Sequence, residues 1–194
     1  MKQEYDSRKT DICQVSGVFK SNGYPFPTGC TILDYGGGKC DKNINYMAQK
    51  GCQVIVYDPF NRSPEYNERT FDIFNNSDVQ FITCNNVLNV IKEEEIIIDI
   101  IKTISELAQR KNATAIFTFH YGNRTGIGTP TERGWQRNNK ISWYYDLISS
   151  LNCFAVVKKT KNMIICLPPT ALSGKRTSRP KKNTLFNLNV RSMF

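Results

Sequence analysis

One stretch in the first third of the chain limits the possible folds more than any other feature. An apolar run, Thr31-Ile-Leu-Asp34, leads through Tyr35 to three consecutive glycines, and a second apolar run, Gln53-Val-Ile-Val-Tyr57, ends at Asp58. Short apolar runs with a helix-length segment between them predict a strand–helix–strand unit. Glycines at the first turn of such a unit let the backbone pass close to a ligand, so this stretch predicts a binding site.

The acids at the two strand ends indicate which ligand such a site would take. An acid that ends the second strand, here Asp58, accepts hydrogen bonds from ribose hydroxyls. The dinucleotide fingerprint G-x-G-x-x-G is incomplete, because Asp41 stands at its third glycine. An acid just before the glycines, Asp34, suits a ligand with cationic ammonium and sulfonium groups better than one with a pyrophosphate. These residues predict S-adenosylmethionine (SAM) as the cofactor.

The rest of the chain alternates between strand and helix patterns. Residues 59–76 are polar and rich in turn formers, so the third strand that most such folds carry is expected to be reduced, around 69–74 at most, or absent. The closing segments, 153–159 and 163–167, predict an antiparallel hairpin around a short turn. The other expected elements are helices at 39–50, 93–111 and 140–151 and strands at 79–84 and 113–120.

The glycine turn and Asp58-Pro59 resemble motif I and the second-strand acid of the class I SAM-dependent methyltransferases. The resemblance covers about residues 8–166, and residues 78–91 look like the fourth strand of that fold and the start of the next helix. It implies an α/β, Rossmann-like fold whose sheet is mostly parallel and ends in a C-terminal antiparallel hairpin. The Val-Leu-Asn-Val-Ile ending at 87–91, and the short segment between Asp58-Pro59 and the strand at 78, are also similar to small phage and plasmid methyltransferases and to those associated with bacterial DNA phosphorothioation.

The resemblance implies specific roles at the cofactor site. Gly36 and Gly38 would allow close backbone approach to the methionine part of the cofactor. Asp34 would orient its ammonium group, directly or through water, and Asp58 would hold the ribose hydroxyls. The complete cofactor-binding set that we expect is Asp34, Gly36, Gly37, Gly38, Asp58, Asn85 and Asn86.

Asn85 and Asn86 stand where DNA methyltransferases that act on amino groups carry Asp/Asn-Pro-Pro-Tyr/Phe. The sequence here lacks the prolines and the aromatic residue, which argues against methylation of adenine N6 or cytosine N4. The resemblance places the two asparagines beside the cofactor, and capping of the following turn is the alternative role. Cytosine-C5 chemistry needs a Pro-Cys nucleophile, whereas Cys84 precedes an asparagine at an expected strand end.

A polar, glycine-rich segment, residues 122–139, follows the strand that ends at His120 and would lie over the transferred methyl group. His120 is a candidate base, although a lone histidine is more often structural. The resembling methyltransferases carry a similar segment with G-W-Q-x-N, which favours a substrate or lid role over a plain surface loop. The candidate acceptor contacts are Arg124, Arg133 and Arg137 for phosphates, Trp135 for stacking on a base, and Gln136 and Asn138 for base edges.

The charge of the chain, +9, indicates a polyanionic partner. Residues 168–194 contain six lysines or arginines and no acid, so we divide the chain into a methyltransferase domain at 1–167 and a basic C-terminal tail at 168–194. Basic clusters are the usual electrostatic signature of nucleic-acid binding. The tail and the segment 122–139 are therefore expected to contact nucleic acid, DNA in particular, with solubility as the alternative role of the tail.

Other features of the composition narrow the class of protein. No apolar run is long enough to span a membrane, so no membrane partner is expected. Seven cysteines without a C-x-x-C pair, together with a single histidine, do not form a metal-ligand pattern, so no metal site is predicted. The odd, unpatterned cysteine set predicts reduced thiols and a cytoplasmic protein of a bacterial or phage-infected cell. The sequence does not indicate an oligomeric state.

Together these patterns give three interpretations. The leading one is an enzyme that transfers a methyl group from SAM to nucleic acid, most simply as a DNA modification that a phage could encode. The second keeps the enzyme but makes a small molecule or a protein the acceptor. The third is an inactive methyltransferase-like protein that only binds nucleic acid, and the intact Gly36, Gly38 and Asp58 argue against it.

Overall fold

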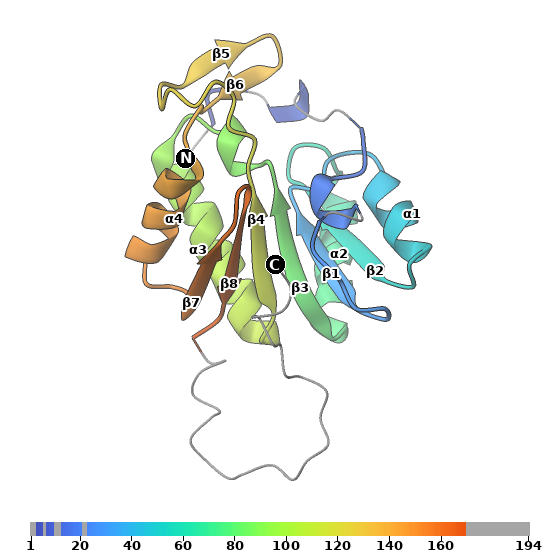
Figure 1. The fold of residues 1–194 in the computed structure, drawn as a ribbon. Helices are drawn as coiled ribbons and strands as arrows, with labels where there is room; N and C mark the ends of the chain where they lie inside the picture. The colour runs from blue at the N-terminus through green and yellow to red at the C-terminus, as the bar shows by residue number, and fades with distance from the viewer. Residues whose placement is uncertain (1–2, 6, 10–12, 21–22, 170–194) are drawn as a thin grey trace.

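A six-stranded sheet forms the centre of the molecule (Figure 1). The computed structural model describes residues 3–5, 7–9, 13–20 and 23–169. The strands lie in the order β2-β1-β3-β4-β8-β7; β1 to β4 run parallel, and β8 is antiparallel to both β4 and β7. This confirms the mostly parallel sheet with a C-terminal hairpin. The strand bounds are β1 Thr31–Tyr35, β2 Gln53–Tyr57, β3 Val79–Asn85, β4 Thr114–Thr118, β7 Val156–Lys159 and β8 Met163–Leu167.

Helices cover both faces of this sheet because successive strand residues point to opposite sides. On one face, Leu33 and Ile55 belong to a large core that also contains Phe74, Ile101 and Tyr144 from the helices. On the other face, the neighbouring strand residues, such as Ile32 and Val54, pack with Val18, Phe19 and Met47. The helical elements are η1 Ser7–Lys9, η2 Gly17–Phe19, α1 Lys42–Ala48, α2 Pro64–Asn76, η3 Leu88–Val90, α3 Glu94–Lys111 and α4 Ile141–Ser150.

The segment between β2 and β3 forms helix α2, so of the two expected alternatives for the third strand, reduced or absent, the structure has the second. The side chain of Ser63 caps the helix by accepting a hydrogen bond from the Tyr66 amide (3.2 Å), and Pro64 occupies the first helical turn. Thr70 and Phe74, four residues apart, are buried on its inner face. The sheet therefore ends at β2, and the third strand is absent from the part of the chain that the structure describes.

A second, two-stranded sheet lies at the top of the molecule in Figure 1, above the carboxyl ends of the parallel strands. Its strands are β5 Thr129–Thr131 and β6 Gly134–Gln136, which pair antiparallel. The expected glycine-rich segment at 122–139 thus contains a hairpin, and we refer to residues 122–139 as the lid.

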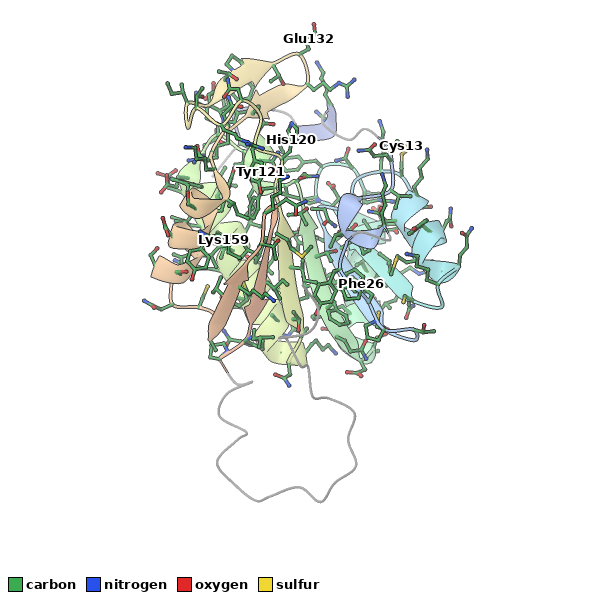
Figure 2. The ribbon with its side chains drawn as sticks, in the orientation of Figure 1. Cys13, Phe26, His120, Tyr121, Glu132 and Lys159 are labelled. Atoms are coloured by element: carbon green, nitrogen blue, oxygen red, sulfur yellow. A yellow bond between two sulfur atoms is a disulfide. The ribbon has the colours of Figure 1, made fainter. Side chains whose placement is uncertain are left out.

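Cys13 and Cys40 form a disulfide with an S–S distance of 2.03 Å, near the top of α1 in Figure 2. The expectation that all cysteines are reduced is therefore wrong at this pair. The two cysteines are 27 positions apart in the sequence, and only the folded path of the N-terminal segment brings them together. The remaining cysteines carry free thiols; Cys153 is half-buried, and Cys30, Cys52, Cys84 and Cys166 are buried.

Two further expectations concern membranes and the tail. Across the described residues, no helix has the length and apolar character needed to cross a membrane. The basic tail predicted at 168–194 lies outside the described residues from position 170 onward.

Candidate cofactor and acceptor site

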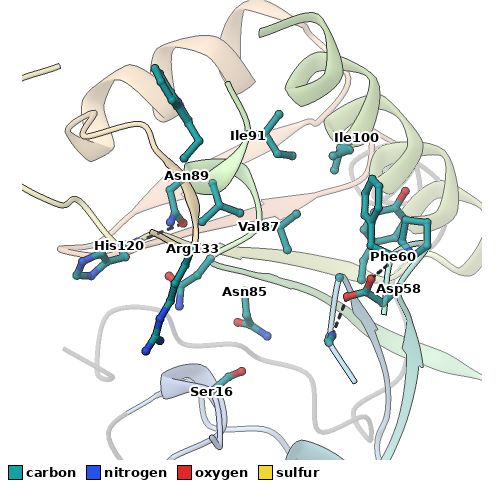
Figure 3. A pocket seen from close by; sticks show the side chains of 18 of the residues that line it. Ser16, Asp58, Phe60, Asn85, Val87, Asn89, Ile91, Ile100, His120 and Arg133 are labelled. Atoms are coloured by element: carbon teal, nitrogen blue, oxygen red, sulfur yellow. Dashed lines mark hydrogen bonds between the residues drawn. The ribbon is translucent and has the colours of Figure 1, made fainter. Parts of the chain in front are cut away.

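A cavity of about 740 Å³ lies at the carboxyl ends of the parallel strands (Figure 3). The glycine turn after β1 and the ends of β2 and β3 form one part of its wall. Helix α3, η3, the lid and the N-terminal segment complete it. In open α/β sheets this edge is where ligands bind, so the cavity is the candidate site.

The glycine turn can be built only from glycines. Gly36 and Gly38 have φ angles of +77° and +76°, in the left-handed region that other residues rarely adopt. A Cβ added to Gly36 would lie 2.4 Å from Cγ2 of Val87, and one added to Gly37 would lie 2.8 Å from Oδ2 of Asp34. The turn therefore brings bare backbone to the cavity wall.

Asp34 lies beneath this turn and does not line the cavity. Its side chain is fully buried and accepts hydrogen bonds from Asn43 Nδ2 (2.8 Å), Thr83 Oγ1 (2.7 Å) and Asn85 Nδ2 (2.8 Å). Burial raises the pKa of the Asp34 carboxyl, and these three hydrogen bonds oppose that rise. Asp34 therefore holds Asn43 and Asn85, which both line the cavity, from beneath the turn.

Asp58 lines the cavity and is held rigidly by main-chain amides. Its Oδ2 accepts a hydrogen bond from the Gly38 amide (2.9 Å), and its Oδ1 accepts from the amides of Phe60 and Asn61 (2.9 Å each). The second-strand acid and the glycine turn are therefore joined directly, as a nucleoside site requires.

Phe60 is a site residue that sequence reasoning missed. Its side chain is 46% exposed, one of two large hydrophobic side chains with high exposure among the described residues, and it lines the cavity beside Asp58. Figure 3 shows Val87 and Ile100 on the same apolar part of the wall. An exposed ring next to a ribose-binding acid suits contact with a purine. The feature of the sequence that could have predicted this residue is its position two residues after Asp58.

Asn85 and Asn86 both line the cavity but have different surroundings. The carboxamide of Asn85 donates to Asp34, and its Oδ1 accepts from Thr118 Oγ1 (3.2 Å), so it links β1, β3 and β4. Asn86 is exposed, has a φ of +56°, and donates its amide to the Thr118 carbonyl (3.0 Å). Asn85 is thus held in place, whereas Asn86 presents its side chain to the cavity.

His120, Arg133 and Gln136 also line the cavity, and Figure 3 shows His120 on the side away from Asp58. The His120 amide donates to Asn89 Oδ1 (3.4 Å), and the His120 carbonyl accepts from Gln136 Nε2 (3.1 Å). The backbone of His120 is therefore held from two sides while its imidazole is exposed. Figure 3 shows the Arg133 side chain crossing the front of the cavity beside His120.

Arg137, Asn138 and Arg124 do not line the cavity, and we reassign them from acceptor contacts to support of the lid. Arg137 donates to the Lys92 carbonyl (2.7 Å) and pairs with Glu94 (3.3 Å). Asn138 is buried and cross-links the lid through the Ile127 carbonyl, the Thr129 hydroxyl and the Asn123 amide. The Arg124 guanidinium lies 5.4 Å from the ring centre of Tyr121.

Trp135 lines the cavity, but its ring is packed within the protein. The Tyr5 ring lies 5.2 Å from it, centre to centre. On another side the Gly128 backbone is so close that an added Cβ would lie 2.1 Å from Cζ2 of Trp135. The ring therefore joins the lid to the N-terminal segment, and a base would need a rearrangement to stack on it.

The N-terminal segment forms a wall that the sequence did not reveal. Gln3, Gln14, Ser16 and Gly17 line the cavity. Ser16 is held by Asn43, which accepts a hydrogen bond from its amide (2.9 Å) and donates one to its hydroxyl (3.1 Å). These contacts join residues 27 positions apart in a polar region without periodicity, so no local pattern predicts them.

These features fit SAM. The bare turn can accommodate the methionine part, Asp58 can accept hydrogen bonds from the ribose, and the apolar wall near Phe60 can contact the adenine. In the described part of the chain, no cluster of three or more histidine, cysteine or acidic side chains could hold a metal ion.

Comparison with known proteins gives a family match. The model of a family described as a methyltransferase domain matches residues 12–163. A TehB-like SAM-dependent methyltransferase from Corynebacterium glutamicum is 14% identical with a TM-score of 0.42 and covers 74% of this chain and 81% of its own. A SAM-dependent methyltransferase from Aquifex aeolicus is 14% identical with a TM-score of 0.41 and covers 74% and 84%. No curated protein matches the chain.

The two structural likenesses are too weak to add to the assignment, which depends on the family match. That match spans the glycine turn, Asp58, the end of β3 and the lid, and so includes nearly the whole cavity wall. The chain belongs to the methyltransferase domain family.

Proposed function

We propose that this enzyme transfers the methyl group of SAM to a nucleic acid, with DNA as the acceptor. The observation that carries the proposal is Arg133 at the acceptor end of the cavity. Its side chain is exposed, and its guanidinium has no hydrogen-bond or ion-pair partner among the described residues. Asp58, at the opposite end, is the only acid among the described lining residues. An open arginine on a cavity wall whose described lining holds a single acid favours an anionic acceptor, and guanidinium groups bind phosphates in a bidentate manner.

The charge of the whole chain supports the same class of acceptor. A net charge of +9 attracts polyanions over a distance comparable to the Debye length. We expect the basic residues of the tail, 168–194, to add affinity for phosphate backbones without selecting a sequence, because charge contacts alone carry no sequence information.

His120 is the residue we propose as the base. Bound SAM supplies an activated methyl group on a sulfonium, so the chain needs mainly to align the acceptor and remove a proton where the acceptor carries one. The exposed imidazole of His120 lies at the acceptor end, and its backbone is fixed by Asn89 and Gln136. A neutral imidazole in this position can accept a proton from an amine or a hydroxyl.

Replacing Arg133 with alanine tests the acceptor. Loss of one charge-assisted phosphate contact should lower kcat/KM for polynucleotide methylation by about 10- to 150-fold. It should also lower the slope of log affinity against log salt concentration by about 0.9 on duplex DNA or about 0.7 on single strands. Transfer of label from radioactive SAM to duplex DNA, single-stranded DNA and RNA measures the first effect, and binding at several salt concentrations measures the second.

Arg69→Ala is the matched control, because Arg69 is an exposed arginine of α2 that does not line this cavity. It removes the same charge and should leave transfer within about twofold of the unmodified enzyme, the range expected for a surface substitution. If SAM binds but no polynucleotide becomes labelled, the acceptor proposal is wrong and a small molecule or protein takes its place. Equal losses in Arg133→Ala and Arg69→Ala would show that only overall charge matters.

A further inference from the structure

We propose that the Cys13–Cys40 disulfide positions residues 13–17 as a wall of the cofactor site, so that cofactor affinity depends on the oxidation state of this pair. The inference concerns SAM binding and goes beyond the proposed acceptor. The disulfide lies at the cavity, because Cys40 itself lines the wall only two residues after Gly38.

The segment that the disulfide holds faces the cofactor end. Gln14, Ser16 and Gly17 all line the cavity, and Figure 3 shows Ser16 below Asn85. Cys40 belongs to the connection between the glycine turn and α1. The disulfide therefore fastens residues 13–17, three of which line the cavity, to the part of the wall that follows the glycine turn.

A chain of hydrogen bonds also connects this segment to the residues beneath the glycine turn. Asn43 bonds both the amide and the hydroxyl of Ser16, and its Nδ2 also donates to Asp34 Oδ2 (2.8 Å). Asp34 in turn supports Asn85. A shift of Ser16 would thus leave Asn43 without two of its partners and disturb the carboxylate beneath the glycine turn.

The two ends of the segment are anchored differently. At its C-terminal end, Val18 and Phe19 are almost completely buried in the core of the α1 face. At its N-terminal end, the covalent bond of Cys13 fixes the chain. Cys13 also has a φ of +50°, a left-handed conformation that is unfavourable for a residue with a Cβ. Once the bond is open, Cys13 can relax to a more favourable conformation and move residues 14–16 with it.

The switch is a thiol–disulfide exchange with a dithiol reductant. A thiolate of the reductant attacks one protein sulfur and breaks the S–S bond; its second thiolate then displaces the protein from the mixed disulfide. The protein gains two electrons and two protons as Cys13 and Cys40 thiols, and the reductant leaves as a disulfide. Dithiothreitol performs this reaction in the test tube.

The affinity for S-adenosylhomocysteine, measured by calorimetry with and without dithiothreitol, tests the inference. Reduction should weaken binding by about 5- to 20-fold, as expected if the released segment occupies its binding position only about 5 to 20% of the time. The double variant Cys13→Ser/Cys40→Ser should bind with the weaker affinity in both conditions. Cys153→Ser, which removes a half-buried thiol away from the cavity, should respond to dithiothreitol as the unmodified chain does.

Thiol counting shows the state of the pair, and circular dichroism shows that the reduced chain remains folded at the temperature of the titration. Equal affinity of the folded chain in both oxidation states would overturn the inference, as would seven titratable thiols in the non-reduced protein. Because the readout uses no acceptor, failure to methylate DNA would refute the proposed function and leave this result unaffected.

Discussion

Replacing Asp58 with alanine is expected to weaken S-adenosylhomocysteine binding by about tenfold to several-hundredfold. The carboxylate is the only acid on the described cavity wall and is placed to accept hydrogen bonds from ribose hydroxyls. Its loss also leaves the amides of Gly38, Phe60 and Asn61 without their acceptor, so the turn itself becomes less ordered. Both effects reduce affinity.

Calorimetry on the purified variant measures the change, with thermal unfolding as the check that it remains folded. Asp72→Ala is the matched control, because Asp72 is an exposed acid of α2 that does not line the cavity. It should bind the cofactor product as tightly as the unmodified chain. Similar affinities for Asp58→Ala and the unmodified enzyme would show that the ribose is held elsewhere.

Local patterns were enough to predict most of the fold. The apolar run that forms β2 was predicted with its observed bounds, because a buried parallel strand reads as a short continuous apolar segment. Helix α2 was missed because residues 59–76 are mostly polar. Its start signal, Ser63 followed by Pro64, and its buried pair at Thr70 and Phe74 were nevertheless present in the sequence.

The candidate site was most predictable where its residues follow strand ends. Asp58 comes directly after β2, His120 lies two residues after β4, and both line the cavity. Arg137 belongs to the same lid as Arg133, yet its side chain points away from the cavity to the carbonyl of Lys92 and to Glu94. The sequence alone does not show to which side of a loop a side chain points, because the direction depends on contacts with residues more than 40 positions away. The disulfide and the N-terminal wall are non-local for the same reason.

Replacing Asp34 with alanine is expected to lower the free energy of unfolding by about 3–5 kcal/mol, one of the largest effects that a single substitution can have. The change removes one fully buried carboxylate and leaves three buried donors, on Asn43, Thr83 and Asn85, without an acceptor. Urea unfolding measures this loss, provided that the slope of unfolding free energy against urea concentration is the same in the variant and the unmodified chain. A decrease below about 1 kcal/mol would mean that the three donors find other partners and that the network is not needed for stability.

The dependence on pH shows which force dominates at this buried acid. Burial raises the Asp34 pKa above its ordinary 3.8 despite the opposing hydrogen bonds, so the folded chain holds the proton more tightly than the unfolded chain. The contribution of this titration to stability is therefore present below about pH 4 and is lost as the pH rises through the folded-state pKa. Asparagine does not titrate, and the other titratable groups contribute equally to the stability of the variant and of the unmodified chain. Asp34→Asn should thus gain stability relative to the unmodified chain as the pH rises above about 4. The opposite trend would show that the hydrogen bonds from Thr83, Asn43 and Asn85 outweigh burial and that the carboxylate is ionised beneath the glycine turn.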